Sequence, residues 1–139
     1  MGRAYGPQDE PEAYLSGIQY AESRGSKTPY KAVGDNGASL GAFQIKEIMF
    51  KDIQRLMPAK WGRMSYEQML TRPELQRAAA HDGLTLLKYH YGLKGDRLMS
   101  AWNTGPTQAR KGVFNAKYAA TVHEGMKKAP YHGGLEDFE

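Results

Sequence analysis

A helical pattern of apolar residues opens the regular part of the chain. Leu15, Ile18 and Glu22 lie at positions i, i+3 and i+7, so a helix would place all three side chains on one face. Gly25 is a typical helix end, because glycine readily adopts the backbone angles that terminate a helix. The pattern therefore predicts a helix that begins near residue 9 or 10 and ends at Gly25. Glu22 would lie in its last turn, beside the apolar face.

The segment that follows lacks a helical pattern. It contains the turn sequence Gly-Asp-Asn-Gly at residues 34–37, with Val33 before it and Leu40 after it. Glycine, aspartate and asparagine favour the backbone angles of tight turns. We therefore expect a small β-hairpin, or an irregular loop, over residues 31–44.

Six more helices are predicted from capping residues, prolines and apolar spacing. The first, over 46–57, would carry its apolar residues on one side: Ile45, Ile48, Met49, Ile53 and Leu56. The six segments are 46–57 ended by Pro58, a short helix capped by Ser65, a long helix from Pro73 to about Tyr91, a helix capped by Asp96, a restart at Pro106, and a last helix from the cap Asn115 to about Lys128. The expected fold class is mainly α (α+β), a helical domain with a small β-hairpin.

Composition limits what the chain can be. Its 139 residues suit a single domain over 1–139, with tails expected at 1–8 and 130–139. The absence of cysteine excludes disulfides, thiolate metal sites and a cysteine nucleophile. Residues 1–13 lack the apolar run of a signal peptide, and no apolar stretch approaches the ~18 residues that span a bilayer. The net charge of +4 is compatible with binding to a polyanion, but it does not distinguish nucleic acid, anionic lipid and the cell envelope.

The histidines do not show the spacing of a metal site. His81 and His90 lie on one predicted helix but not at i and i+4, and His123 and Glu124 are adjacent and so face different ways. We expect neither a metal nor a cofactor.

Glu22 is the first candidate for chemistry. A carboxylate on an apolar face is poorly solvated, which raises its pKa and keeps it protonated, as a general acid must be. The ordinary alternative is a helix-end glutamate that is solvated or paired with Arg24. Gln44 suits either the lining of a groove or the end of a strand. Trp102 taken alone suits a core, and Asn103 suits a helix end.

Four short motifs in order give a stronger signal than any one of them. Glu22-Ser23 stands in YAESRG, Gly41-Ala42-Phe43-Gln44 follows, Ala101-Trp102-Asn103-Thr104-Gly105-Pro106 comes next, and Tyr118 lies in NAKYAATV. Over roughly residues 12–128 the chain resembles the lytic transglycosylase domain of the Slt type. That family's pattern is Glu-Ser, Gly-Leu-Met-Gln, Ala-Tyr-Asn-Ala-Gly-Pro and a tyrosine in the last helix. The chain departs from it where Ala42-Phe43 replaces Leu-Met, Trp102 replaces Tyr and Thr104 replaces Ala.

The resemblance implies a lysozyme-like fold with the β-hairpin beside the active-site cleft. It also implies cleavage of the β-1,4 bond between N-acetylmuramic acid and N-acetylglucosamine in peptidoglycan. Glu22 would protonate the leaving oxygen, the substrate's acetamido oxygen would stabilise the cationic sugar, and Glu22 would then take the proton of the 6-hydroxyl. The product is a 1,6-anhydro ring, formed without water. Ser23, Gln44, Asn103 and Tyr118 would orient the sugar and Glu22. Tyr30 and Trp102 could stack on sugar faces, although core packing suits both of them better.

Three other functions stay open. Asp35 could activate a water and make the chain a hydrolytic muramidase with Glu22 as the acid, or it could simply form the turn. A catalytically silent adaptor would bind glycan without cleaving it. Lys and Arg residues interleaved with aromatics would suit a nucleic-acid-binding module or an ordinary solvated face, and we expect no nucleic-acid partner. These residues are Arg110, Lys111, Lys117, Lys127 and Lys128, with Phe114 and Tyr118.

These expectations put the site of action at the bacterial cell wall, in the periplasm. A wall-degrading enzyme without an export signal suggests a bacteriophage lysin, carried in the virion or released at lysis. The expected partners are peptidoglycan glycan strands, and the expected state is a monomer without a membrane span.

Overall fold

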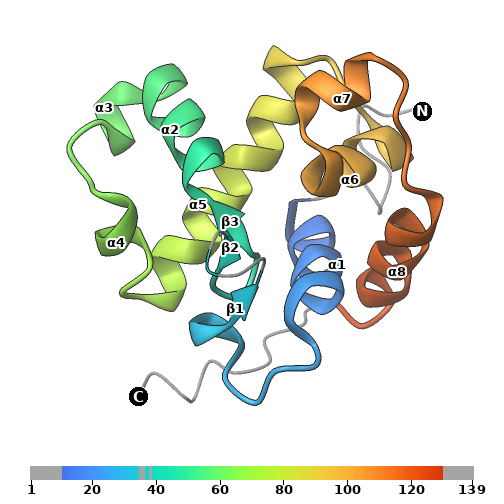
Figure 1. Cartoon of the computed structure of the whole chain (residues 1–139), viewed down its shortest axis with the longest axis horizontal. Helices are drawn as coiled ribbons and strands as arrows, with labels where there is room; N and C mark the ends of the chain where they lie inside the picture. Colours follow the sequence, from blue (N-terminus) through green and yellow to red (C-terminus); the bar gives the residue numbers. More distant parts are fainter. Residues whose placement is uncertain (1–10, 35–36, 38, 130–139) are drawn as a thin grey trace. The chain divides into compact units, whose positions relative to one another are not determined.

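The computed structural model describes residues 11–34, 37 and 39–129, which form helices and a small sheet (Figure 1). The chain is mainly helical with a three-stranded antiparallel sheet, which confirms the expected fold class at this level. The described residues form two compact units. We call residues 22–83 the central unit, and residues 11–21 with 84–129 the terminal unit. The expected tails lie outside the described residues.

The central unit contains the sheet and short helices. It begins with the last two residues of α1 (Pro11–Ser23) and includes all but the end of α5 (Pro73–Thr85). Between these lie η2 (Pro29–Lys31), β1 (Val33–Gly34), β2 (Ser39–Leu40), β3 (Ile45–Lys46), α2 (Glu47–Leu56), α3 (Pro58–Trp61) and α4 (Tyr66–Met69).

The sheet contains the expected hairpin and one strand more. β1 pairs with β2 so that Val33 lies opposite Leu40, and β2 pairs with β3 so that Leu40 lies opposite Ile45. The third strand was not predicted. A strand of two residues has too few positions to show an alternating pattern.

The helices of the central unit agree with the predictions except at two points. Ile48 is 77% exposed, so the prediction that it shares the apolar side of α2 is wrong. Phe50 and Ile53 form the buried face, and Ile48 lies roughly 140° around the helix from Ile53. Pro58 does not only follow α2; it also opens α3, where proline needs no amide partner. Ser65 caps α4 as expected, in a reciprocal capping box with Gln68.

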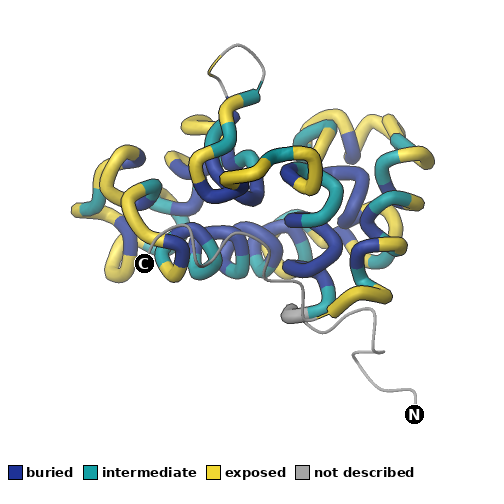
Figure 2. The backbone as a smooth tube through the Cα atoms, turned by 90° about the horizontal axis from the view of Figure 1, so that it is seen from below, coloured by how far each residue is buried: buried dark blue, intermediate teal, exposed yellow. Residues whose placement is uncertain are grey.

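Aromatic rings fill the core of the central unit. Phe50 meets the ring of Trp61 edge-on at 5.6 Å between centroids and lies 6.1 Å from Tyr66. Tyr30 and Phe43 form a second edge-on pair at 6.3 Å. Tyr30 is buried, so it belongs to the core rather than to a surface platform. Figure 2 shows such buried positions in dark blue along the backbone.

The terminal unit is built from helices alone among the described residues. After α5 the chain widens into the π-helical segment η4 (Leu86–His90), followed by α6 (Gly95–Thr104), α7 (Pro106–Arg110) and α8 (Ala116–Met126). Asn115 caps α8 as predicted. The prediction that Asp96 caps α6 is wrong, because the cap position is Lys94 and Asp96 lies within the first turn. No described helix is long and apolar enough to cross a bilayer.

Two glycines let α1 and α8 approach closely. A Cβ on Gly125 would lie 2.5 Å from the Cβ of Tyr20 and 2.9 Å from the Cα of Gly17. A Cβ on Gly17 would lie 2.5 Å from the carbonyl oxygen of Val122. Neither position has room for a larger side chain without moving a helix.

Candidate functional site

Glu22 and Ser23 form the end of α1, and Ser23 ties that end to a loop of the central unit. Ser23 is buried, and its hydroxyl donates a hydrogen bond of 2.8 Å to the carbonyl oxygen of Ala42. Glu22 is half-buried. The bond holds the last turn of α1 beside the Gly41–Gln44 loop, and it therefore fixes the backbone from which the Glu22 carboxylate extends.

The Gly41–Gln44 loop has a strained backbone. Gly41 has φ +87°, and Gln44, with φ 51°, is the one described residue other than glycine with a positive φ. A left-handed residue with a side chain costs roughly 1–2 kcal/mol, so other contacts must offset it. The Gln44 side chain provides one, since its Nε2 donates a hydrogen bond of 2.8 Å to the carbonyl oxygen of Gly41.

Gly34 of β1 makes room for the Gln44 amide. A Cβ at Gly34 would lie 2.2 Å from the Oε1 atom of Gln44. The Nε2 atom of Gln44 also lies 3.4 Å from the carbonyl oxygen of Ala32. The amide is thus held between its own loop and β1, and its Nε2 is engaged by backbone carbonyls.

Gln76 of α5 is a site residue that the sequence did not single out. Its buried Nε2 donates to the carbonyl oxygens of Tyr30 at 2.9 Å and Leu70 at 3.0 Å, and its Oε1 accepts the N–H of Ala42 at 3.0 Å. A Cβ on Gly41 would lie 2.4 Å from that Oε1, which explains the glycine. One amide therefore satisfies three backbone groups around the loop.

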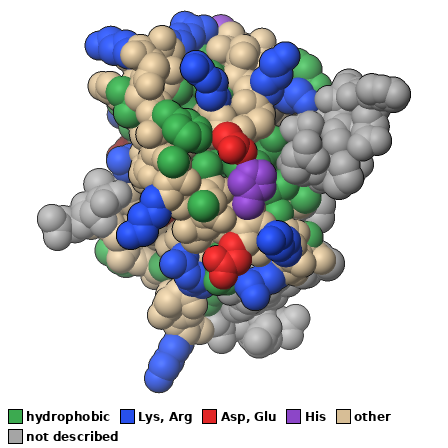
Figure 3. All heavy atoms as spheres, turned by 90° about the vertical axis from the view of Figure 1, so that its right-hand side faces the viewer, with side chains coloured by type: hydrophobic (Ala, Val, Ile, Leu, Met, Phe, Trp, Pro, Cys, Tyr) green, Lys and Arg blue, Asp and Glu red, His purple; other side chains and the backbone are tan. Residues whose placement is uncertain are grey.

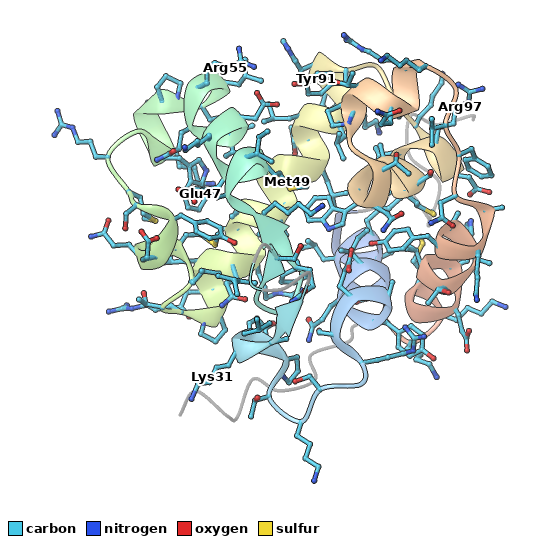
Figure 4. All side chains as sticks on the ribbon, viewed as in Figure 1. Lys31, Glu47, Met49, Arg55, Tyr91 and Arg97 are labelled. Carbon is cyan, nitrogen blue, oxygen red and sulfur yellow. The ribbon has the colours of Figure 1, made fainter. Side chains whose placement is uncertain are left out.

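Tyr66 supports the loop from the side of the sheet. Its hydroxyl donates a hydrogen bond to the carbonyl oxygen of Ile45, the residue after Gln44. Burial, and then the carboxylates of Glu47 and Glu67, raise the pKa of Tyr66 to about 12. Figure 4 labels Glu47 on α2. Tyr66 therefore remains a neutral donor throughout the neutral range.

Asp82 is a buried carboxylate with three donors. Its Oδ2 accepts from Trp61 Nε1 at 2.6 Å and lies 2.9 Å from Lys60 Nζ, and its Oδ1 lies 3.2 Å from His81 Nδ1. Burial by itself would raise the pKa of Asp82, but these donors outweigh it and hold the pKa below its ordinary value. An ionised Asp82 cannot serve as a general acid near neutral pH. It fastens α3 to α5 instead.

In the terminal unit, Asn115 connects two of the predicted site residues. Its Nδ2 donates to the Oδ1 of Asn103 at 2.9 Å, and its Oδ1 accepts the backbone N–H of Tyr118 at 2.9 Å. Its own N–H donates to the hydroxyl of Ser100 at 2.8 Å. Asn103 is exposed and Tyr118 is half-buried. Asn115 thus caps α8 and holds the end of α6 next to its first turn.

Trp102 lies inside the terminal unit rather than on its surface. It is 5% exposed, one residue before the exposed Asn103. Gly105, with φ +92°, ends α6, and Pro106 begins α7 directly after it. The predicted break and restart at this motif are confirmed.

The predicted site residues fall into two groups, one in each unit. Glu22, Ser23 and Gln44 belong to the central unit, and Trp102, Asn103 and Tyr118 belong to the terminal unit. Asp35, the predicted second carboxylate, lies outside the described residues. Within the described part of the chain, no group of three His, Asp or Glu side chains could hold a metal ion.

Comparison with known proteins adds no assignment. The chain matches no protein-family model, no curated protein and no solved structure. Its function is therefore argued from its own residues and geometry.

Proposed function

We propose that the chain is a peptidoglycan lytic transglycosylase with a lysozyme-like fold. It would cleave the β-1,4 bond between N-acetylmuramic acid and N-acetylglucosamine and leave 1,6-anhydro ends. The observation that carries the proposal is the pairing of the four motifs. The Ser23–Ala42 bond joins the first motif to the second, and Asn115 joins the third to the fourth. Motifs known only by their order along the chain thus meet in pairs, one pair within each unit.

The contacts assign different tasks to these residues. Glu22 acts as the acid and then as the base, since it is the half-buried carboxylate of the first motif. Ser23 and Gln44 direct their polar atoms to Ala42 and Gly41, so they act as positioning residues. Asn103, with its amide exposed at the end of α6, offers hydrogen bonds to a sugar.

The proposed reaction needs no second protein carboxylate. Glu22 gives its proton to the leaving oxygen, the acetamido oxygen of the substrate bonds to the anomeric carbon, and the 6-hydroxyl then displaces it while Glu22 takes back a proton. The number of protons on Glu22 is the same before and after the cycle. The proposed place of action is the bacterial cell wall, on which the chain would act as a bacteriophage lysin.

The first test replaces Glu22 by Gln and measures the soluble products released from purified peptidoglycan by mass spectrometry. We expect wild type to release anhydro-ended muropeptides and Glu22→Gln to release at least about 10²-fold less, because one side chain carries both proton steps. Glu47→Gln is the matched control, since it removes one exposed carboxylate from the same unit (Figure 4). Circular dichroism shows whether both variants fold.

The same experiment separates the alternatives. Reducing ends in place of anhydro ends identify a muramidase, because hydrolysis adds one water. Binding of wild type to peptidoglycan without any released product identifies an adaptor. Activity of Glu22→Gln within tenfold of wild type contradicts the assignment of Glu22.

A further inference from the structure

The loop between α7 and α8 exposes two adjacent apolar side chains. Val113 is 45% exposed and Phe114 is 47% exposed. Isolated exposed apolar residues are common, but neighbours at the tip of a connecting loop are a feature of interaction surfaces. This pair has no part in the site proposed above.

Hydrogen bonds on both sides hold the pair in place. Before the pair, Gly112 follows the end of α7 and has φ +90°. The N–H of Gly112 donates to the carbonyl oxygen of Ala109, and the N–H of Val113 donates to that of Gln108. These two backbone hydrogen bonds satisfy carbonyl groups at the C-terminal end of α7. After the pair, Asn115 caps α8 and bonds to α6. The exposed position of Val113 and Phe114 is therefore built into a fixed turn.

The sequence on both sides of the pair carries basic residues and no acidic ones. Residues 97–123 contain no Asp or Glu, and their four basic residues are Arg97, Arg110, Lys111 and Lys117. All four are exposed. Figure 3 shows blue Lys and Arg side chains spread over the face at the right-hand side of Figure 1, where α7 and α8 lie.

The acidic groups that flank this stretch are already engaged. Asp96 lies 2.6 Å from the Nε2 of His123, and Glu124 accepts a hydrogen bond from the hydroxyl of Tyr20. On the basic side, the guanidinium of Arg110 lies 4.9 Å from the ring of Tyr91, which Figure 4 labels. Lys111 and Lys117 on either side of the apolar pair are exposed.

We propose that this turn docks on the surface of an anionic lipid bilayer. Val113 and Phe114 enter the boundary between headgroups and acyl chains, while Arg110, Lys111 and Lys117 meet the lipid phosphates. Charge complementarity selects an anionic surface, and the apolar pair selects a bilayer rather than a nucleic acid. Binding to single strands relies on rings that stack on bases, and Val113 has none.

The test is sedimentation of the full chain with vesicles of phosphatidylcholine alone and of phosphatidylcholine mixed with phosphatidylglycerol. We expect binding to the mixed vesicles only. Val113→Ser with Phe114→Ser should weaken it by roughly tenfold or more, because buried apolar area is lost. Lys111→Gln and Lys117→Gln should each weaken it by about fivefold. Val33→Ser with Ile48→Ser is the matched control, since those side chains are 69% and 77% exposed in the other unit.

Several outcomes would overturn the proposal. They are equal binding to both vesicle types, unchanged binding of the Val113/Phe114 double variant, and an equal loss in the Val33/Ile48 control. Binding of a single-stranded DNA oligonucleotide that Phe114→Ser abolishes would identify a nucleic-acid surface instead. Cleavage of purified peptidoglycan by the Val113/Phe114 variant should equal that of wild type, so the two proposals fail separately.

Discussion

At the scale of single residues, buried polar side chains decide the shape of the central unit. Gln76 satisfies three backbone groups from three segments, and Gln44 closes the loop that it belongs to. Each of these amides pairs with backbone groups, and a backbone group left buried without a partner would cost about 1–3 kcal/mol. Such residues act on chemistry indirectly, because they fix the backbone next to Glu22.

Asp82 provides a prediction that depends on pH. Its pKa in the fold is below the unfolded value of about 4, so its ionised form stabilises the protein above that pH, and this contribution is lost as the pH falls through the folded pKa. Asp82→Asn should lower the free energy of unfolding at pH 7 by about 2–3 kcal/mol. The difference from wild type should shrink below about pH 4. Urea unfolding at a series of pH values measures both effects.

A surface ion pair serves as the control for Asp82. Asp52 pairs with the exposed Arg55 on α2, so Asp52→Asn should cost under about 1 kcal/mol. An Asp82→Asn loss no larger than this, or a difference from wild type that stays constant down to pH 2, would contradict the role given to the three donors.

At the scale of elements, the approach of α1 to α8 depends on glycine. Gly125→Ala would bring a Cβ into the space of Tyr20 and Gly17, and we expect a loss of about 1–3 kcal/mol from overpacking. The higher helix propensity of alanine would offset at most about 1 kcal/mol of this loss of stability. Thermal unfolding followed by circular dichroism measures the net change.

Gly25 gives the matched comparison for that substitution. A Cβ there would meet no atom within 4 Å, so Gly25→Ala should be neutral or slightly stabilising. Equal melting temperatures for Gly125→Ala and wild type would show that the helices can move apart at little cost.

Local signals predicted most of the elements. Ser65 and Asn115 were recognised as caps because their hydrogen bonds go to residues three positions further on, and Pro106 because proline suits a first helical turn. The sequence does not predict β3, because two residues are too few to show an alternating pattern. The prediction for Ile48 is wrong because apolar character alone does not decide which side of α2 is buried. Lys94 was missed as a cap position because its side chain makes no capping bond.

The site was predicted only as far as its motifs reach. Short sequence patterns predict Ser23, Gln44 and Asn103 as site residues, but they do not predict the hydrogen bonds of these residues to Ala42, Gly41 and Asn115. Gln76 had no local signal at all, since its partners Ala42 and Tyr30 lie 34 and 46 residues away. Contacts at that distance depend on how the chain folds back, which spacing along the sequence does not encode.

At the scale of the whole molecule, the two units share two helices. α1 and α5 each contain residues of both units, so unfolding one unit would interrupt helices of the other. The two tryptophans of the chain, Trp61 and Trp102, lie in different units and can report on each. In Trp61→Phe and in Trp102→Phe, we expect the fluorescence and circular dichroism transitions in urea to coincide within each variant. Separate midpoints would show that the units unfold independently.

The π-helical turn at Leu86–His90 accommodates one additional residue without changing the direction of the side chains that follow it. The N–H of Tyr91 donates to the carbonyl oxygen of Leu86, five positions back, so this turn holds one residue more than an α-helix would. A deletion of one residue within this turn would leave an ordinary α-helical turn, and the later side chains would keep their direction. The ring of Tyr91 would then stay beside the guanidinium of Arg110. The wide turn therefore behaves as an insertion that the helix has absorbed without realigning α6 and the helices after it.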